Sequence, residues 1–575
     1  MSWIHTERDP GALPAAKRQR AGCGDVPGEE ARPQSKRGRL RAIVLLLVQV
    51  AIVLHVWHWY RTGRSVSPLE PSEAGQTLTE GIVNAGFVLF VVAIASTLVL
   101  GRFFCGWACH VVALQDGCAW LLGKIGLRPK PVRSRVLAYV PLFVAVWMFV
   151  LPSVVQIAEG TLPQGLRVEL TTEDYWARFP GPVVAVLTFL AVGGAAVWLL
   201  GSKGYCTYGC PYGAVFAFAD RFAKGRIRVT DDCNGCGHCT AVCTSRVEVH
   251  REVRDFGNVV DAGCMKCLDC VSACPKDALY FGFAPKATAA APSPRAAVAK
   301  ERSARSHDFT GAEEFVMAAV FVGTLLFAYR GLYGVVPLLL ASTLAVFAAI
   351  GTVAAWRLVS RRDFTVQHVV LRRDGRFTAG GGAAAVALLV GAAFTVHSAV
   401  VRYHDTAARS GAQALAAGFD QGLARATAAH LDWLVEYGLW HAPQIDLERG
   451  RLRRALGEPA LAEPALAAAA DRGDDPEPAL FELLRAQLEQ RAFDRASATL
   501  ERLLDATRTS TASPSLLELA RGLESQLGDA RAISNAARVA LLAGDREDAA
   551  SRLERLRAEH PSDPRTAALA RLLGE

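Results

Sequence analysis

The sequence predicts an α-helical integral membrane protein with about seven transmembrane helices, an inserted cysteine-rich domain and an appended all-α domain. Three observations support this fold class. The 575-residue chain is 51% hydrophobic, which is more apolar than expected of a purely soluble protein. Twelve of its 14 cysteines fall into C-x2-C or C-x3-C groupings, which suit metal or redox chemistry better than disulfides. After residue 401 the chain has no cysteine and shows the apolar periodicity of helices.

Residues 1–41 are rich in Arg, Lys, Pro and Gly, and they lack the apolar core of a cleavable signal sequence. We expect a disordered basic tail on the cytoplasmic side. The net charge of +8 comes from basic residues concentrated in particular loops, which indicates membrane topology before nucleic-acid binding. The sequence contains no motif that reads DNA or RNA, so nucleic acid is not expected as a partner.

Apolar stretches that suit membrane-spanning helices follow the tail. They cover residues 42–60, 82–100, 136–155, 181–201, 315–329, 331–356 and 377–401. The first four form a membrane domain over residues 42–228, and the last three form a second group over residues 313–401. The fifth stretch is short and ends at Arg330.

Basic loops mark the cytoplasmic side, because Lys and Arg near span ends translocate poorly. Such residues gather at 36–41, 102–135 and 357–376, whereas the loops 61–81 and 156–180 carry two Arg each. This alternation predicts a cytoplasmic N-terminus and a cytoplasmic cysteine-rich domain. It places the C-terminal domain outside the cytoplasm.

Two runs, CNGCGHCTAVC at 233–243 and CMKCLDCVSACP at 264–275, repeat one cysteine spacing. Cysteines at C-x2-C-x2-C with a fourth after three more residues suit a loop around a [4Fe–4S] cluster, and the fourth cysteine then binds the other cluster. We expect one cluster on Cys233, Cys236, Cys239 and Cys274, and the other on Cys264, Cys267, Cys270 and Cys243. Zinc and disulfides are the alternatives, but two such runs are much rarer in zinc sites. Thr244 stands where a proline is usual, and this removes no ligand.

Two C-x3-C pairs lie just after the second and fourth stretches, and Cys23 and Cys118 stand apart from all groupings. The pairs are Cys105 and Cys109 in RFFCGWACHVV, and Cys206 and Cys210 in KGYCTYGCPYG. Because residues i and i+4 share a helix face and the pairs are 101 residues apart, we interpret the four spans as a duplicated two-span unit. This predicts one composite site at the cytoplasmic membrane surface. A redox dithiol, a Cu(I) site, an additional iron–sulfur site and inert buried thiols stay open, while the inner location argues against c-type haem.

Residues 229–283 resemble the bacterial two-cluster ferredoxin domain, which implies an α+β domain of two cluster-binding loops, hairpin strands and short helices. FCGWAC, YCTYGCP and the two cysteine runs, over about residues 40–283, together resemble the membrane-bound polyferredoxins, a family that includes NapH, NosR and CcoG/FixG. This resemblance implies electron transfer at a bacterial cytoplasmic membrane and, in the oxidase-assembly branch, reduction of copper. His110 replaces the proline that usually follows the first pair, which leaves the branch open.

Residues 284–312 form an Ala-, Pro- and Lys-rich linker, and residues 402–575 form the all-α domain. Within residues 540–564, small, apolar and helix-ending residues occupy the positions that a tetratricopeptide-like (TPR-like) helix pair requires. These residues are Gly544, Ala549, Leu553, Leu556 and Pro561. We expect a TPR-like domain that binds a protein partner, with an irregular helical bundle as the alternative.

Three histidines lie within the apolar stretches. His55 and His58 are one helical turn apart near the outer end of the first stretch, and His397 has a similar depth in the last. An ionisable side chain within a span is a functional candidate. Quinol binding, copper delivery and b-type haem suit imidazoles there, and interfacial histidines beside an aromatic belt are the structural alternative.

These features predict a membrane-bound iron–sulfur protein that relays electrons between a quinol or cytoplasmic donor and a membrane or periplasmic acceptor. Such a chain is an electron-transfer component. Whether it is also a metal or quinol oxidoreductase stays open, and no residue is assigned a catalytic role. The expected cofactors are two [4Fe–4S] clusters, with copper or a third iron–sulfur site at the membrane pairs. The alternatives are a metal-centre assembly factor that reduces copper and a non-redox docking scaffold that uses the helical repeats.

Overall fold

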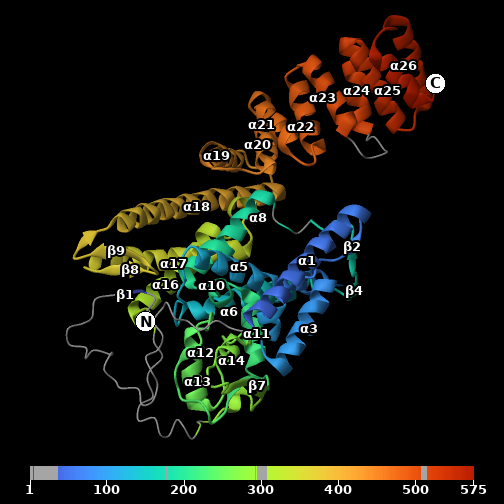
Figure 1. The fold of residues 1–575 in the computed structure, drawn as a ribbon. Coiled ribbons are helices and arrows are strands. Elements are labelled where there is room, and N and C mark those ends of the chain that lie inside the picture. The colour runs from blue at the N-terminus through green and yellow to red at the C-terminus, as the bar shows by residue number, and fades with distance from the viewer. Residues whose placement is uncertain are drawn as a thin grey trace. The chain divides into compact units, whose positions relative to one another are not determined.

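The computed structural model describes residues 4–5, 37–176, 179, 181–291, 293, 307–506 and 514–574. The chain is mostly helical and divides into two compact units (Figure 1). One unit contains residues 1–331 and 335–397, and the other contains residues 332–334 and 398–575. Most of the predicted basic tail, and residues 294–306 of the predicted linker, lie outside the described residues.

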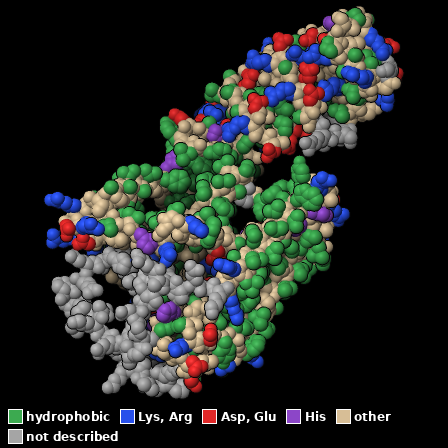
Figure 2. Space-filling model, viewed as in Figure 1, with side chains coloured by type: hydrophobic (Ala, Val, Ile, Leu, Met, Phe, Trp, Pro, Cys, Tyr) green, Lys and Arg blue, Asp and Glu red, His purple; other side chains and the backbone are tan. Residues whose placement is uncertain are grey.

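Six helical stretches are long and apolar enough to cross a membrane. They are α1 (Gly38–Thr62), Leu137–Glu159, Pro182–Leu200, Gly311–Tyr329, α17 (Leu338–Ser360) and α18 (Ala379–Ala417). Three of these stretches contain named helices. The second stretch contains α6 (Val140–Ala145) and α7 (Leu151–Glu159), and the third contains α8 (Pro182–Phe189) and α9 (Ala196–Leu200). The fourth begins with α16 (Gly311–Thr324). Figure 2 shows hydrophobic side chains over α1, where Leu46 and Val53 are more than half exposed, as expected of a helix that faces lipid.

The second predicted span forms a shorter helix, α3 (Ala85–Leu100). Its start is fixed by Asn84, whose side-chain oxygen accepts a hydrogen bond of 2.8 Å from the backbone N–H of Phe87. Its 16 residues rise only about 24 Å, less than the roughly 30 Å of a bilayer core. The described chain therefore has six full-length candidate spans and one shorter apolar helix where seven spans were expected.

The last span continues beyond its predicted end. The sequence predicts an end at residue 401, but α18 is one helix of 39 residues that ends before Gly418. Most residues from 402 to 417 favour helix, and the one glycine among them, Gly411, lies against the side chain of Thr427 in α19 (Gln421–Tyr437). The predicted domain boundary thus falls inside a continuous helix.

Short strands join the loops of the first unit. The strands β1 (Ile4–His5), β8 (Phe364–Val366), β9 (Val369–Arg373) and β10 (Arg376–Phe377) form one sheet in that order. Two further pairs link β2 (Ser65–Val66) to β5 (Thr171–Thr172), antiparallel, and β3 (Ile82–Val83) to β4 (Arg167–Val168), parallel. The loops 61–81 and 156–180, which the sequence predicts on one side of the membrane, therefore pair with each other.

The cysteine-rich segment is a small α+β domain at one end of the first unit (Figure 1). It has an antiparallel hairpin of β6 (Gly225–Val229) and β7 (Leu279–Phe283) and three short helices. These helices are α12 (His238–Ala241), α13 (Val249–Phe256) and α14 (Asp269–Ser272). Its core contains Ile227, Val253 and Val259 together with Cys264 and Cys270. This is the architecture that the ferredoxin resemblance implies.

The second unit continues α18 into a succession of helices. They are α19, α20 (Pro443–Ala455), α21 (Pro459–Arg472), α22 (Glu477–Glu489), α23 (Phe493–Ala506), α24 (Pro514–Leu527), α25 (Ala530–Leu542), α26 (Arg546–Glu559) and α27 (Pro564–Leu573). Each packs mainly on its neighbours in the chain, and Leu466, Leu480 and Leu500 lie in the shared core. This arrangement is typical of helical repeats.

Candidate functional site

The structure brings the cysteines of the two runs together in two sets. Cys233, Cys236, Cys239 and Cys274, here the first set, line one cavity on the hairpin domain. Cys274 belongs to the second run, so the runs cross over as the spacing predicts. His238 lines the same cavity, and its Nδ1 is buried without a hydrogen-bond partner among the described residues.

The second set contains Cys243, Cys264, Cys267 and Cys270. Burial raises the pKa of Cys243, and nearby Cys267 and Cys264 raise it further. Burial likewise raises the pKa of Cys270, with added contributions from Cys267, Cys264, Cys243 and also Cys239 of the first set. Cys243, the fourth cysteine of the first run, therefore lies near the cysteines of the second run.

Both loops use the same unusual backbone. In the first run Gly235 and Gly237 have φ of 74° and 81°, and at the equivalent positions of the second run Lys266 and Leu268 have φ of 52° and 64°. Left-handed backbone is rare for residues with a side chain and costs each of them roughly 1–2 kcal/mol. Both loops adopt this left-handed backbone in spite of its cost. This indicates that each loop needs the conformation to wrap around its set of cysteines.

These residues fit [4Fe–4S] clusters. A cubane is bound at separate iron corners, so its four thiolates surround a cavity instead of meeting at a point. Within the described parts of the chain, no three His, Cys, Asp or Glu side chains converge as ligands of a single metal ion. The assignment of individual ligands stays a prediction from the spacing, to which the grouping of the thiols adds support.

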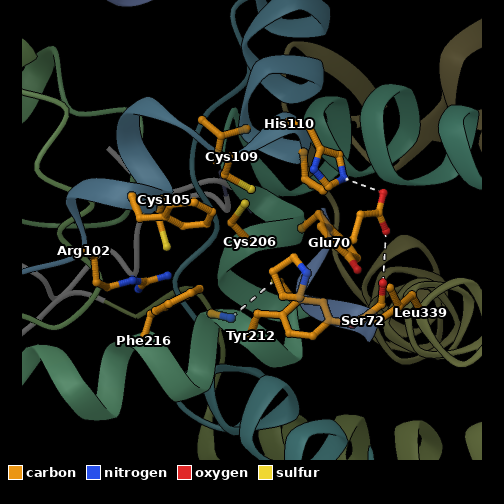
Figure 3. A pocket seen from close by; sticks show the side chains of 17 residues that line it. Glu70, Ser72, Arg102, Cys105, Cys109, His110, Cys206, Tyr212, Phe216 and Leu339 are labelled. Carbon is orange, nitrogen blue, oxygen red and sulfur yellow. Dashed lines mark hydrogen bonds and ion pairs between the residues drawn. The ribbon is translucent and has the colours of Figure 1, made fainter. Parts of the chain in front are cut away.

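The two C-x3-C pairs meet in one cavity of about 90 Å³ (Figure 3). Cys105, Cys109, Cys206 and Cys210, here the membrane set, all line it. Figure 3 shows the sulfur atoms of Cys109 and Cys206 facing each other, and all four cysteines are free thiols. The duplicated unit thus forms one composite site, as the sequence predicts.

The two halves of this site have matching local structure. Cys105 and Cys206 each occupy the third position of a five-residue helix, α4 (Phe103–Trp107) and α10 (Gly204–Tyr208). Cys109 and Cys210 each precede the first residue of a longer helix, α5 (His110–Lys124) and α11 (Pro211–Asp220). The equal spacing of the pairs therefore reflects a repeated turn between two helices.

The membrane set packs against α1. Gln49, near the middle of α1, donates a hydrogen bond of 3.2 Å to the backbone oxygen of His110, and Leu45 packs in one core with Cys105 and Cys206. The pairs therefore contact a candidate span directly, and their place at the cytoplasmic membrane surface stays a prediction. Glu70, from the loop before α3, also lines the cavity and lies 3.6 Å from His110.

Polar groups surround the membrane thiols. The Arg102 side chain lines the cavity with Cys105, the Gln115 amide donates to Cys206 Sγ at 2.8 Å, and the Gly213 N–H donates to Cys210 Sγ at 3.4 Å.

The FCGWAC loop (104–109) contacts the second cysteine run directly. Trp107 Nε1 donates a hydrogen bond of 3.0 Å to the backbone oxygen of Lys266, and Arg102 donates one of 2.9 Å to that of Ala262. Helix α4 has two faces, because Phe103 and Trp107 pack on the hairpin domain whereas Cys105 packs among the spans. It therefore joins the membrane set to the second set.

Buried charges hold this junction. Lys266 is fully buried, and its Nζ lies 2.9 Å from Oδ1 of Asp220, which is also fully buried. Asp220 Oδ2 binds Arg226 at 3.0 Å, and Asp220 Oδ1 accepts a hydrogen bond from the Arg102 N–H. Sequence analysis missed these residues, because a charged residue carries no sign of its burial in the sequence.

The three candidate histidines lie elsewhere. His55 Nε2 is 2.9 Å from the backbone oxygen of Val66, and His58 Nδ1 is 3.2 Å from Ser65 Oγ. His397 is half-buried on α18. Within the described parts of the chain, none of the three lines the cavity of the membrane set. The contacts of His55 and His58 anchor α1 to the β2 turn, as interfacial histidines do.

Comparisons with protein families separate the two C-x3-C segments from the two cysteine runs. A family model described as a 4Fe-4S binding domain matches residues 84–128 and again residues 183–230, so each match contains one C-x3-C pair. A model described as a 4Fe-4S dicluster domain matches residues 226–275.

Several curated proteins are similar over the same region. The ferredoxin-type protein MauN of methylamine utilization from Methylobacillus flagellatus is 31% identical over 221 residues, which are 34% of this chain and 73% of that protein. The ferredoxin-type protein NapH from Haemophilus influenzae is 28% identical, over 36% of this chain and 71% of that protein. The putative electron transport protein YccM from Escherichia coli is 23% identical, over 44% and 76%.

A comparison with solved structures matches YrrB, a TPR protein with an unusual peptide-binding site, at 16% identity. The match covers 33% of this chain and 79% of YrrB. The TM-score of 0.15 is too low to define the fold of the matched region.

Proposed function

The chain belongs to the polyferredoxin family of ferredoxin-type electron-transport proteins, and from this we propose that it relays single electrons between a quinol or cytoplasmic donor and an acceptor in the membrane or periplasm. The family models are described by 4Fe-4S binding, and the named relatives are described as ferredoxin-type or electron transport proteins. A [4Fe–4S] cluster supplies one-electron chemistry without a bond being made or broken. The first and second cysteine sets are its proposed ligands in this chain.

One observation carries the proposal, namely the contact between the FCGWAC loop and the second cysteine run. A Cβ placed on Gly106 would lie 2.3 Å from the Met265 carbonyl oxygen and 3.4 Å from the Cys267 N–H nitrogen, so the two loops touch. Electron transfer requires short separations, and this contact joins the second set to a cavity among the spans. The second set is therefore the proposed membrane-side end of the relay.

The two sets differ in their electrostatic surroundings. The second set lies beside the buried Lys266, and Arg41 forms an ion pair of 3.5 Å with Asp269, a residue between two of its cysteines. The first set lies on a loop whose Cys233 and Cys236 are only partly buried. Nearby positive charge favours an added electron, and a partly exposed loop suits contact with a soluble redox protein.

Anaerobic purification with iron and sulfide analysis and EPR under graded reduction tests this function. We expect at least about eight irons per chain and two interacting paramagnetic centres. Cys239→Ala should remove one signal and Cys270→Ala the other, whereas Cys118→Ala, outside all three sets, should remove neither. An iron-free protein, or loss of the same signal in both variants, would refute the proposal.

We further propose a bacterial inner-membrane location with the hairpin domain in the cytoplasm and the C-terminal helices in the periplasm. Its support is the alternation of basic loops in the sequence. Alkaline phosphatase fused after residue 293 should be inactive, and a fusion after residue 574 should be active. The opposite pattern would reverse the topology.

Copper handling is the second candidate function. The convergence of four thiols favours it, because thiolates are the soft ligands that Cu(I) prefers. In this case the purified protein should bind Cu(I) tightly, and Cys105→Ala with Cys206→Ala should abolish binding. Retention of Cu(I) binding in that double variant would exclude this cavity as the copper site.

A further inference from the structure

We propose that Cys105, Cys109, Cys206 and Cys210 hold a third [4Fe–4S] cluster, inside the bundle of spans. The inference rests on the proposed function and deepens it, because it adds a redox centre at the membrane end of the relay. Four thiols from two segments 101 residues apart line a single cavity with room for an inorganic core. Ligation by four cysteine thiolates is the common mode of [4Fe–4S] clusters.

The first support is the repeated geometry of the two halves. Each half supplies one thiol from a short helix and one from the residue before a longer helix. Each C-x3-C pair therefore presents two sulfurs to the cavity, and the two pairs surround the cavity from opposite sides. Inert core cysteines have no need for this duplication.

The second support is the charge around the cavity. Thiolate-ligated clusters carry net negative charge, which cations and N–H donors stabilise. Arg102 is buried and lines the cavity beside Cys105, and Lys203, the residue before α10, is buried near Cys206 with its Nζ also paired with Asp116. Both cations hold the same place before their short helices. Each half therefore supplies a cation as well as two thiols.

The longer helices add their N-termini. Helix α5 has 15 residues and α11 has ten, and a helix N-terminus attracts negative charge through its unpaired N–H groups and its dipole. In α11 the Gly213 N–H donates a hydrogen bond of 3.4 Å to Cys210 Sγ. Cys109 holds the equivalent position before α5.

The surroundings favour iron–sulfur over other groups. His110 is the one imidazole in the cavity lining of the described chain, and its Nε2 lies 3.6 Å from a Glu70 carboxylate oxygen. The lining contains no methionine among the described residues. Four thiols, with no thioether and with the one imidazole beside a carboxylate, suit a cubane. Each transfer moves one electron, so the donor loses one and the irons of the site gain one.

Iron and sulfide analysis of the full-length protein, purified anaerobically in detergent, tests the inference without any variant. We expect about twelve irons and about twelve sulfides per chain. About eight would overturn the third cluster while leaving the proposed function intact, and fewer would overturn both. About ten irons, or bound copper, would overturn the cubane assignment.

Variants locate the extra iron. Cys105→Ala with Cys206→Ala should lose about four irons and one EPR or Mössbauer component while the hairpin-domain signals persist. The matched control is Cys118→Ala, since Cys118 lies on α5 close to Gly193 but outside the cavity lining of the described residues. An unchanged iron content in the double variant would overturn the assignment, as would equal loss in the control.

Discussion

Replacing Gly106 with alanine tests the junction between the membrane spans and the hairpin domain. The new Cβ would lie 2.3 Å from the Met265 carbonyl oxygen, whereas ordinary contacts begin near 3.4 Å, so the loops must separate by about 1 Å. Overpacking of this kind costs about 1–3 kcal/mol. We expect lower stability and slower electron transfer between the membrane side and the second set, with all iron retained.

Gly117→Ala is the matched control. Gly117 lies in α5, a few residues along the chain, and an added Cβ there would meet nothing within 4 Å. Alanine stabilises a helix interior by up to about 1 kcal/mol relative to glycine. The two variants should therefore differ in unfolding free energy by about 2 kcal/mol or more.

Anaerobic denaturant unfolding, followed by loss of visible cluster absorbance, measures stability. Stopped-flow reduction with a quinol analogue measures transfer. Equal stability and equal reduction rates for Gly106→Ala and Gly117→Ala would refute the view that the close contact at Gly106 couples the membrane spans to the hairpin domain.

Further predictions concern charge, the C-terminal unit and the metal. Lys266→Met should lower the potential of the second-set centre in a redox titration. It should also cost about 1–3 kcal/mol, because Asp220 loses one buried partner but keeps Arg226. An unchanged potential would contradict this. Leu466→Ala should cost the C-terminal unit about 2–5 kcal/mol in thermal unfolding without loss of iron, since Leu466 is fully buried in that unit. Removing iron with a chelator under reducing conditions should make residues 230–275 sensitive to protease while the C-terminal helices resist, because metal binding and folding are coupled in small cluster domains; continued resistance of that segment would indicate a structural core independent of the clusters.

The sequence predicted those features that depend on local spacing. The cysteine intervals indicated the grouping of Cys274 with the first run and of Cys243 with the second, and the equal offset of the C-x3-C pairs indicated one composite site. Both inferences use only distances along the chain. The ferredoxin-type family, inferred from the same motifs, is confirmed by the family models and relatives.

Other features depend on contacts between distant segments. Hydropathy marks residues 82–100 as a span, but it does not reveal that Asn84 caps α3 and so starts this helix at Ala85. Apolar composition ends near residue 401, yet helix propensity carries α18 on to Ala417. The Asp220–Lys266 pair joins residues 46 positions apart, and neither residue signals its burial in the sequence.

Rapid-freeze EPR of the full-length protein, mixed with a quinol analogue in detergent, tests the central claim most directly. The account predicts that the signal lost in Cys270→Ala appears before the signal lost in Cys239→Ala, because the second set contacts the FCGWAC loop. Reduction of the first set before the second, or at an unchanged rate in Cys270→Ala, would contradict it.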